Sequence, residues 1–383
     1  MAILLIILGV ALVVIVLWDA FEAMVLPRRI NRRFRLARIF YRATWIPSAA
    51  IARRMKSRSR RETYLSLYGP LSLILLLGIW AVGLIVGFAI IQWATGSALN
   101  VPEGRVSFST YLYLSGTTFF TLGFGDVTPL ASLGRGLAVI EAGMGFGFLA
   151  IVIGYLPVIY QAFSRREVNI SLLDARAGSP PSALELLRRH SQDNELEEIL
   201  HLLHDWERWA AELLESHLSY PVLCFYRSQH SNQSWLASLT TILDVSALVL
   251  IGIDGIPTRQ ARLTFAMARH AVVDLAQIAH TPPHAPEVDR LPASELSALR
   301  EGLREAGLML RDGETAEKRL AELRHKYEPF VNSLSEYLLM ELPPWLIKTS
   351  KADNWQTSAW KHTTGSLTAP TAQAEGGKAS KCD

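Results

Sequence analysis

Cysteines, strand-like runs and ligand-binding signatures are all scarce in this chain, and each absence narrows what the protein can be. Only two of its 383 residues are cysteines, Cys224 and Cys382, so no disulfide framework can form and the composition fits a reducing cytoplasm. No Gly-x-Gly-x-x-Gly follows a strand-like run and no EF-hand Ca²⁺ loop is present, which argues against nucleotide-binding and calcium-binding modules. Neither a nucleophile–base arrangement nor a phosphate-binding loop occurs, so we expect no enzyme activity and no cofactor.

Charged residues are scarce in three long apolar runs, where Glu141 is the one exception. Half of the residues are hydrophobic, and the runs at about 2–18, 70–93 and 136–160 are each long enough to cross a bilayer. The first run lies where a signal peptide would lie. No basic segment precedes it and no small-x-small cleavage site follows, so a retained signal anchor is the better interpretation.

Acidic residues are also missing from one basic stretch. Between Arg28 and Arg61 the chain has thirteen Arg or Lys residues and no Asp or Glu. The positive-inside rule places this stretch in the cytoplasm. We therefore expect the N-terminus outside, and the chain returning to the cytoplasm behind Arg165 and Arg166. The protein is expected to be multi-pass in the cell (inner) membrane, with a cytoplasmic C-terminal domain.

The most informative stretch lies between the second and third apolar runs and reads Thr121-Leu122-Gly123-Phe124-Gly125-Asp126. Glycine adopts left-handed backbone without the penalty of a β-carbon, so Gly123 and Gly125 allow the alternation that points consecutive carbonyls the same way. Carbonyls stacked around an axis can replace the hydration shell of an ion. Thr121 can add its carbonyl and its hydroxyl at the inner end. The stretch resembles the Thr-Val-Gly-Tyr-Gly-Asp signature of potassium channels, with Leu122 for Val and Phe124 for Tyr.

The resemblance extends over roughly residues 70–160. Ser107 to Phe120 is too short to span a membrane and too apolar for a surface loop, which suits a re-entrant pore helix. Potassium-channel pores commonly show a Pro after the filter, a Gly-Arg pair near the start of the inner helix and a glycine further on. Here these are Pro129, Gly134-Arg135 and Gly145. A glycine-rich turn between ordinary membrane helices would explain neither the helix nor the spacing.

The resemblance implies an all-α membrane protein, a potassium-selective channel subunit that conducts K⁺ passively, with no metal beyond that permeant ion. One chain supplies one pore hairpin, so the working unit should be a homotetramer. Two alternatives stay open. Leu122, Phe124 and Phe120 alter the filter's surroundings, which fits a weakly selective cation channel. The other alternative is a membrane-tethered helical scaffold with a non-conducting pore.

The expected domains follow in chain order. They are an N-terminal transmembrane helix (1–27), a basic juxtamembrane segment (28–69), the pore domain (70–160), a helical cytoplasmic domain (161–347) and a disordered tail (348–383).

Departures from the family pattern predict how the filter is supported. The family's pore-helix aromatic, which bonds the filter tyrosine, is replaced by Leu114, so Leu114 and Phe124 should make an apolar contact behind the filter. A second family contact predicts a hydrogen bond between Tyr113 and Asp126. Thr117 stands where some potassium channels place a Glu.

Glu141 is an acid inside the third apolar run. Buried acids in membrane segments usually have a partner or a task. We expect it to accept hydrogen bonds from Ser115, Thr117 or Thr118, or else to make a helix contact with no effect on conduction.

Gating residues are expected in the third run. Gly145 matches the hinge position of gated pores, and Gly143 with Gly147 is equally suited to close helix packing. Pro157 should bend the helix near its cytoplasmic end. The predicted gate lies between Gly154 and Gln161.

The arginines at 29, 32, 35 and 38 have the spacing of a voltage-sensing helix. Only one membrane segment precedes them, so an interfacial helix is the better interpretation, with Ile30, Phe34, Ala37 and Tyr41 as its apolar face. Anionic lipid headgroups are the expected partners of the stretch from Arg28 to Arg61. The near-balanced net charge of +3 gives no support for nucleic-acid binding.

Beyond residue 161 the pattern is helical, with predicted segments at 182–190, 193–219, 234–251, 258–280, 293–311 and 314–342. Residues 235–253 could instead span the membrane, but Asp244 at their centre favours a buried core helix. Two groups could ligate a metal, although solvated surface histidines are the simpler interpretation: His201, His204 and Asp205, and His280, His284 and Asp289. The regulatory ligand of this domain cannot be identified from the sequence.

Overall fold

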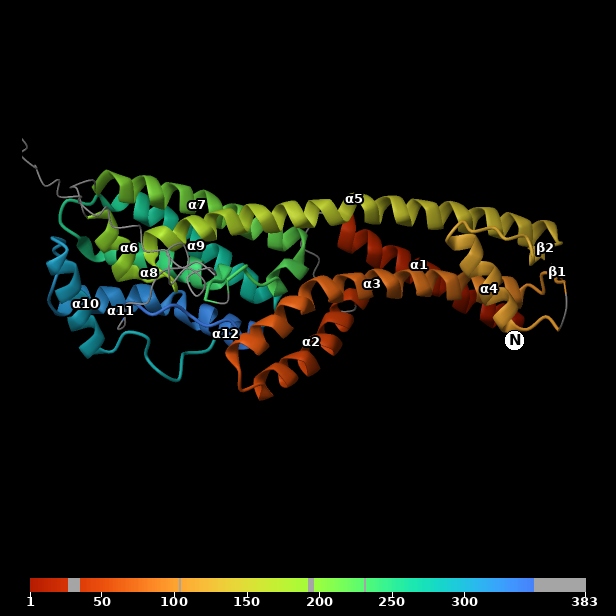
Figure 1. Cartoon of the computed structure of the whole chain (residues 1–383), viewed down its shortest axis with the longest axis horizontal. Helices are drawn as coiled ribbons and strands as arrows, with labels where there is room; N and C mark the ends of the chain where they lie inside the picture. The colour runs from red at the N-terminus through yellow and green to blue at the C-terminus, as the bar shows by residue number, and fades with distance from the viewer. Residues whose placement is uncertain (27–34, 103–104, 192–195, 231, 348–383) are drawn as a thin grey trace, which may run out of the picture.

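The computed structural model describes residues 1–26, 35–102, 105–191, 196–230 and 232–347. They form an elongated molecule built almost entirely of helices (Figure 1). In chain order the helices are α1 (Ala2–Met24), α2 (Leu36–Arg54), α3 (Arg58–Ala94), α4 (Phe108–Phe119), α5 (Ser132–Ala177), α6 (Ala183–His190), α7 (Leu196–Ser219), α8 (Trp235–Gly252), α9 (Thr258–Ile278), α10 (Ala293–Glu305), α11 (Glu314–His325) and α12 (Glu328–Leu338). A short 3₁₀ helix covers Pro221–Phe225, and two-residue strands β1 (Leu99–Asn100) and β2 (Thr128–Pro129) pair antiparallel.

Among the described residues, four helices have the length and composition to cross a membrane, and the three longest of them are α1, α3 and α5. They contain the three predicted apolar runs, so the predicted all-α membrane class is confirmed. Both α3, with 37 residues, and α5, with 46, are longer than the roughly 20 residues that a bilayer core needs. The excess of each lies at the end of the molecule where α6 to α12 gather (Figure 1). We call α6 to α12 and their connections, residues 178–347, the C-terminal unit.

Glycines let α1 lie against α3. A Cβ on Gly9 would lie 2.9 Å from the carbonyl oxygen of Gly87, and a Cβ on Gly87 would lie 2.6 Å from a methyl of Val13. Small residues at such a crossing let two backbones approach closely within a membrane. Helix α1 is therefore packed on α3 along its length (Figure 1).

A buried carboxylate holds the far end of this pair. Asp19 of α1 accepts a hydrogen bond from the indole N–H of Trp80 on α3 and another from the backbone N–H of Ala37 at the start of α2, both at 3.0 Å. One side chain thus joins three helices, and it satisfies an N–H at a helix start that has no partner within its own helix.

The apolar face predicted for an interfacial helix is not free where the structure describes it. Ile30 and Phe34 lie outside the described residues. Ala37 is buried by protein and Tyr41 stacks on Phe225 of the 3₁₀ helix, with ring centroids 5.7 Å apart. The described part of the predicted apolar face is therefore covered by the protein itself, and no residue near it in the sequence signals these distant partners.

Helices in the C-terminal unit largely follow the predicted ranges, with two exceptions. The predicted helix 314–342 is two helices, α11 and α12, separated at Lys326 and Tyr327. Pro329 explains the break, because it has no N–H and its ring would clash with the carbonyl four residues earlier in a continuous helix. Similarly, the segment predicted as 293–311 stops at Glu305, and Leu310 instead forms an isolated β-bridge with Ile253.

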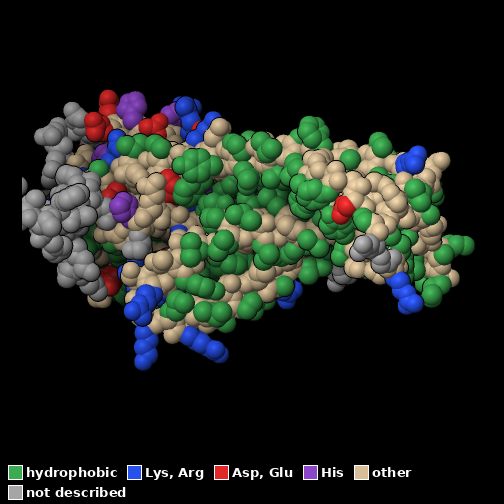
Figure 2. Space-filling model, turned by 45° about the vertical axis from the view of Figure 1, so that its right-hand side comes forward, with side chains coloured by type: hydrophobic (Ala, Val, Ile, Leu, Met, Phe, Trp, Pro, Cys, Tyr) green, Lys and Arg blue, Asp and Glu red, His purple; other side chains and the backbone are tan. Residues whose placement is uncertain are grey.

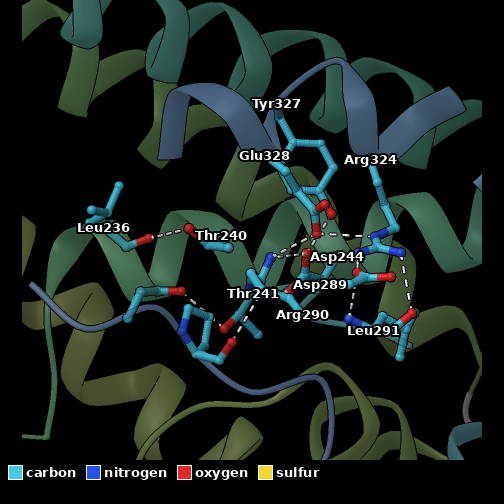
Figure 3. A network of polar contacts seen from close by, with 12 residues as sticks. Leu236, Thr240, Thr241, Asp244, Asp289, Arg290, Leu291, Arg324, Tyr327 and Glu328 are labelled. Atoms are coloured by element: carbon cyan, nitrogen blue, oxygen red, sulfur yellow. Dashed lines mark hydrogen bonds and ion pairs between the residues drawn. The ribbon is translucent and has the colours of Figure 1, made fainter. Parts of the chain in front are cut away.

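Helix α8 is apolar enough to span a membrane, but 89% of it is buried inside the protein. It is the core helix of the C-terminal unit. Its Asp244 accepts from both terminal nitrogens of Arg290, at 2.7 and 3.3 Å, and from the hydroxyl of Tyr327 at 2.5 Å (Figure 3). Burial raises the pKa of Asp244 to about 6, so the carboxylate that pairs with Arg290 is still ionised at pH 7.

The same network continues through Glu328, which pairs with Arg290 at 3.2 Å and with Arg324 at 3.0 Å. Arg324 also pairs with Asp289, and both guanidinium groups lie 5.7 Å from the ring of Trp345. These charges fix the 289–291 loop and the α11–α12 junction onto α8 (Figure 3).

Asp244→Ala should destabilise the protein by about 3–5 kcal/mol, because it leaves the Arg290 charge buried without its partner. Asp254→Ala is the control, since Asp254 is an exposed acid two residues beyond α8, and surface changes usually stay within about 0.5 kcal/mol. Helix unfolding of the full-length protein in detergent, followed by circular dichroism against urea, gives both values. Equal midpoints for the two variants would contradict the role assigned to the network.

Candidate ion-conduction site

The short helix α4 and the loop that follows it lie between α3 and α5 at one end of the molecule (Figure 1). The observed α4 confirms the predicted short helix. Its 12 residues extend only about 18 Å, less than a bilayer core. At its start, the hydroxyl of Thr110 accepts from the backbone N–H of Ser107 at 3.2 Å. Strands β1 and β2 join the two chain segments on either side, pairing Leu99 with Pro129.

The loop Thr121–Asp126 has an alternating backbone. Positive φ angles occur at every second residue: 55° at Thr121, 57° at Gly123 and 79° at Gly125. The glycines are the positions where the sequence predicted left-handed backbone. Thr121 also has a positive φ, although a positive φ is uncommon for a residue with a β-carbon. The sequence analysis did not predict left-handed backbone at this position. Such alternation is the backbone condition for consecutive carbonyls to point one way.

Side chains of the loop are largely uncovered within one chain. Leu122 and Phe124 are 56% and 67% exposed. Leu114 is instead buried in a cluster with Ala89, Leu99 and Tyr111. The predicted contact between Leu114 and Phe124 is therefore not made within a single chain, because Leu114 faces α3 and β1.

The C-terminal end of the loop, at Asp126, makes the predicted hydrogen bond. The hydroxyl of Tyr113 on α4 donates a hydrogen bond to a carboxylate oxygen of Asp126 at 2.9 Å. This contact confirms the predicted pairing across thirteen residues. It fixes the end of the loop to the middle of the helix that precedes it.

A buried polar cluster lies behind α4. Glu141 of α5 accepts from the hydroxyl of Ser115, as predicted, and from the side-chain amide of Gln92 on α3 at 3.4 Å. All three side chains are buried, and Ser115 also lies 2.7 Å from the carbonyl oxygen of Ile85. Thr117 takes no part, since its hydroxyl donates to its own helix at Leu114. The cluster thus connects the three helices that hold the loop.

The sequence analysis did not predict that Gln92 contacts Glu141. It lies inside the second apolar run, and a polar amide in such a run needs a partner just as an acid does. That signal could have paired it with Glu141.

Gly145 has a packing role that its expected position as a hinge did not suggest. A Cβ there would lie 2.0 Å from the carbonyl oxygen of Phe119 and 2.8 Å from the carbonyl carbon. Only glycine lets α5 approach the last residue of α4 so closely. Gly154 has nothing within 4 Å, and α5 runs through Pro157 as one helix. The gating role of these three residues stays a prediction.

Neither histidine group forms a metal site. Among the residues that the structure describes, no group of three or more His, Cys, Asp or Glu side chains could hold a metal ion. His284 instead lies 2.9 Å from Glu336.

Comparisons with known proteins agree with this geometry. Residues 74–161 match a family model described as "Ion channel". The chain is 25% identical over 247 residues to the uncharacterized membrane protein YdjJ of Bacillus subtilis (strain 168), which covers 61% of this chain and 71% of that protein. It is 34% identical over 84 residues to Protein LctB of Bacillus caldotenax, covering 19% of this chain and 62% of that protein, less than two thirds of its length. No solved structure matches the chain.

Gly145→Ala should displace the end of α4 and destabilise the protein by about 1–3 kcal/mol, the usual range for overpacking, with reduced ion flux into proteoliposomes. Gly78→Ala is the matched control, because its new methyl group would meet nothing within 4 Å. Flux and thermal midpoint are measured for both variants. If the two variants behave alike, the contact with Phe119 does not constrain the loop.

Proposed function

We propose that this protein is a potassium-selective channel subunit that works as a homotetramer, because residues 74–161 match a family model described as "Ion channel". The observation that carries the proposal is the backbone of the Thr121–Asp126 loop, with positive φ at alternate residues between a short helix and a tyrosine brace. In the proposal this loop is the selectivity filter.

The proposed chemistry is replacement of water by carbonyl oxygens. A K⁺ ion that enters the filter loses its hydration shell to the carbonyls from Thr121 to Gly125, and the hydroxyl of Thr121 adds a ligand at the inner end. The protein supplies no covalent chemistry. Its contribution is a rigid loop, which the bond from Tyr113 and the cluster around Glu141 support.

The incomplete pore of one chain supports the proposed four-fold assembly. A single loop surrounds no axis, and one face of α5 is left bare: Val139, Phe146 and Ile153 are each at least 70% exposed. Hydrophobic side chains likewise cover the middle of the molecule in Figure 2. In the proposed tetramer these side chains meet the neighbouring copies, the pore or lipid.

The proposed gate is the inner helix α5, controlled by the C-terminal unit, which we place in the cytoplasm. Arg166 of α5 supports this link: its guanidinium is buried and donates to the carbonyls of Leu223 and Tyr226, both at 2.9 Å. A movement of the C-terminal unit would therefore move α5. Gly154 and Pro157, on the membrane side of Arg166, would absorb the change.

Anionic lipids are the proposed partners of α2, in a narrower zone than the whole basic stretch. Arg58 and Arg61 pair with Glu341 of the C-terminal unit at 2.9 and 3.0 Å. The outer face of α2 remains, with Ile39 and Ile46 exposed and Arg42 beside them. An apolar stripe flanked by arginine suits the headgroup region of an anionic leaflet.

A weakly selective cation channel is the second candidate. Phe124 carries no hydroxyl and is 67% exposed in its own chain, so in the proposal the filter's backing depends on the neighbouring copies.

Reversal potentials of the purified protein in planar bilayers, under a potassium/sodium gradient, test the proposal. A value near the potassium equilibrium potential is expected. A value near zero with clear unitary currents would favour the weakly selective channel, and silence across voltage, pH and Ca²⁺ would favour a non-conducting scaffold. Native mass spectrometry should count four copies.

Tyr113→Phe should shift the reversal potential toward zero, because Asp126 loses the donor that braces the filter. Tyr111→Phe is the matched control: it removes a hydroxyl from the same helix, but that hydroxyl donates to the carbonyl of Ser97 at 2.7 Å and not to the filter. The control should lower stability by about 1 kcal/mol without changing selectivity. Equal selectivity of the wild type and Tyr113→Phe would contradict the proposed role of the Tyr113–Asp126 hydrogen bond in selectivity.

Pro157→Ala should change the open probability of single channels and leave the reversal potential as it is. Alanine restores the backbone N–H and lets the helix bond to the carbonyl of Ile153, which stiffens the proposed gate. A changed ion preference in this variant would place the residue's effect at the filter instead.

A further inference from the structure

Helix α5 has a single covered stripe in the segment where the gate is proposed. Among residues 151–160 the covered ones are Val152, Tyr155 and Ile159. They are spaced by three and four residues, so they lie on one face of the helix. The other residues of this segment are exposed within one chain. Tyr155 is therefore the one covered residue inside the proposed gating segment Gly154–Pro157.

The hydroxyl of Tyr155 bonds to the end of α1. It donates to the carbonyl oxygen of Ala23 at 3.4 Å. Ala23 lies in the last turn of α1, where the carbonyls have no N–H partner within the helix and need a donor from outside. Tyr155 also packs against the apolar cluster to which Val16 and Ala20 of α1 belong. Figure 1 shows this end of α1 beside the middle of α5, so α1 and the gating segment are in direct contact.

The end of α1 is itself anchored to its neighbours. Asp19 accepts from the indole of Trp80 on α3 and from the backbone N–H of Ala37 at the start of α2, both at 3.0 Å. One turn further along α1, a carboxylate oxygen of Glu22 lies 3.5 Å from the guanidinium of Arg35, and these side chains are 5% and 18% exposed. A helix end that is anchored in this way restrains any helix that is bonded to it.

The ring of Tyr155 makes a second contact, on the side of the C-terminal unit. It lies 5.6 Å from the ring of Tyr220, at the start of the 3₁₀ helix, in an edge-on arrangement. One side chain thus connects the proposed gate both to α1 and to the C-terminal unit. Helix α1 lies outside residues 74–161, which match the ion-channel family model, so its contact with α5 is an addition to the shared pore.

We propose that α1 restrains the gate and that Tyr155 is the positioning residue through which it acts. The proposal rests on the gate that the proposed function assigns to α5, and it adds a controlling element from outside the pore domain. A movement of α5 within Gly154–Pro157 carries the hydroxyl of Tyr155 away from Ala23. One gating state therefore has this hydrogen bond and the other lacks it, so the bond biases the equilibrium between them.

Single-channel recordings of the full-length protein in planar bilayers test this role. Tyr155→Phe removes the hydroxyl and keeps the ring beside Tyr220. The ratio of open to closed time should change at least about threefold, at the low end for a hydrogen bond because this one is long, while the reversal potential stays as it is. Tyr64→Phe is the matched control, a half-buried tyrosine of α3 whose hydroxyl makes no hydrogen bond in the described part of the chain. Hydrogen exchange of residues 17–26, followed by mass spectrometry, reports whether the end of α1 is released.

A changed ratio together with faster exchange at residues 17–26 is the result expected for Tyr155→Phe. An unchanged ratio in a conducting channel would overturn the proposal and leave the proposed function standing. A changed ratio with unchanged exchange would overturn the role of α1, and an equal change in Tyr64→Phe would overturn the specific role of Tyr155. A shifted reversal potential would place the effect at the filter, again against the proposal. A silent wild type would overturn the proposed function itself, and the gating role with it.

Discussion

The buried charge of Arg166 is the constraint on which the connection between the two ends of the molecule depends. Its guanidinium is paired with Glu167 at 3.0 Å and donates to the carbonyl of Leu223 in the 3₁₀ helix and to that of Tyr226 just after it. Burial lowers the pKa of His217 well below its ordinary value, and the charge of Arg166 lowers it further, so His217 is neutral and accepts from Arg166 at 3.3 Å. A buried ion without these partners would cost several kcal/mol, so the 3₁₀ segment and α5 stay together.

The same 3₁₀ segment also holds the outer helix. Phe225 packs between Trp45 and Tyr68, with ring centroids 4.9 and 5.3 Å away, and Trp45 donates to the carbonyl of Tyr337 on α12 at 3.0 Å. Gly69 of α3 leaves room for the ring of Tyr226, which a Cβ would approach to 2.7 Å. Inner helix, outer helix and C-terminal unit therefore meet at one packed junction. Because packed junctions rearrange between discrete states and do not deform continuously, any control of the pore by the C-terminal unit acts here.

How much of this the sequence could predict depends on how local each cause is. The helix before the loop, the glycine conformations and the bond from Tyr113 to Asp126 depend on residues within about twenty positions, and sequence patterns report such neighbours. The apolar face of α2 is different. The aromatic partner of Tyr41, Phe225, lies nearly 200 residues away in the sequence. From the sequence alone, an apolar stripe next to arginines therefore predicted a helix at the membrane surface. Pro329 was a local signal against one long helix, but the helical periodicity around it favoured a continuous helix. In the structure the chain divides into α11 and α12 near this proline.

The glycines of α5 show why a motif position does not by itself define a role. Three of them alternate along one turn, but only Gly145 faces α4, where a methyl group would meet the carbonyl of Phe119. A Cβ on Gly143 or Gly147 would meet nothing within 4 Å in the same chain. The residue at the expected hinge is thus fixed by packing, while the flanking glycines lower the helix propensity without that restraint. Bending of α5, where it occurs, is therefore expected on the Gly154–Pro157 side of the contact, with the part beside the loop held rigid.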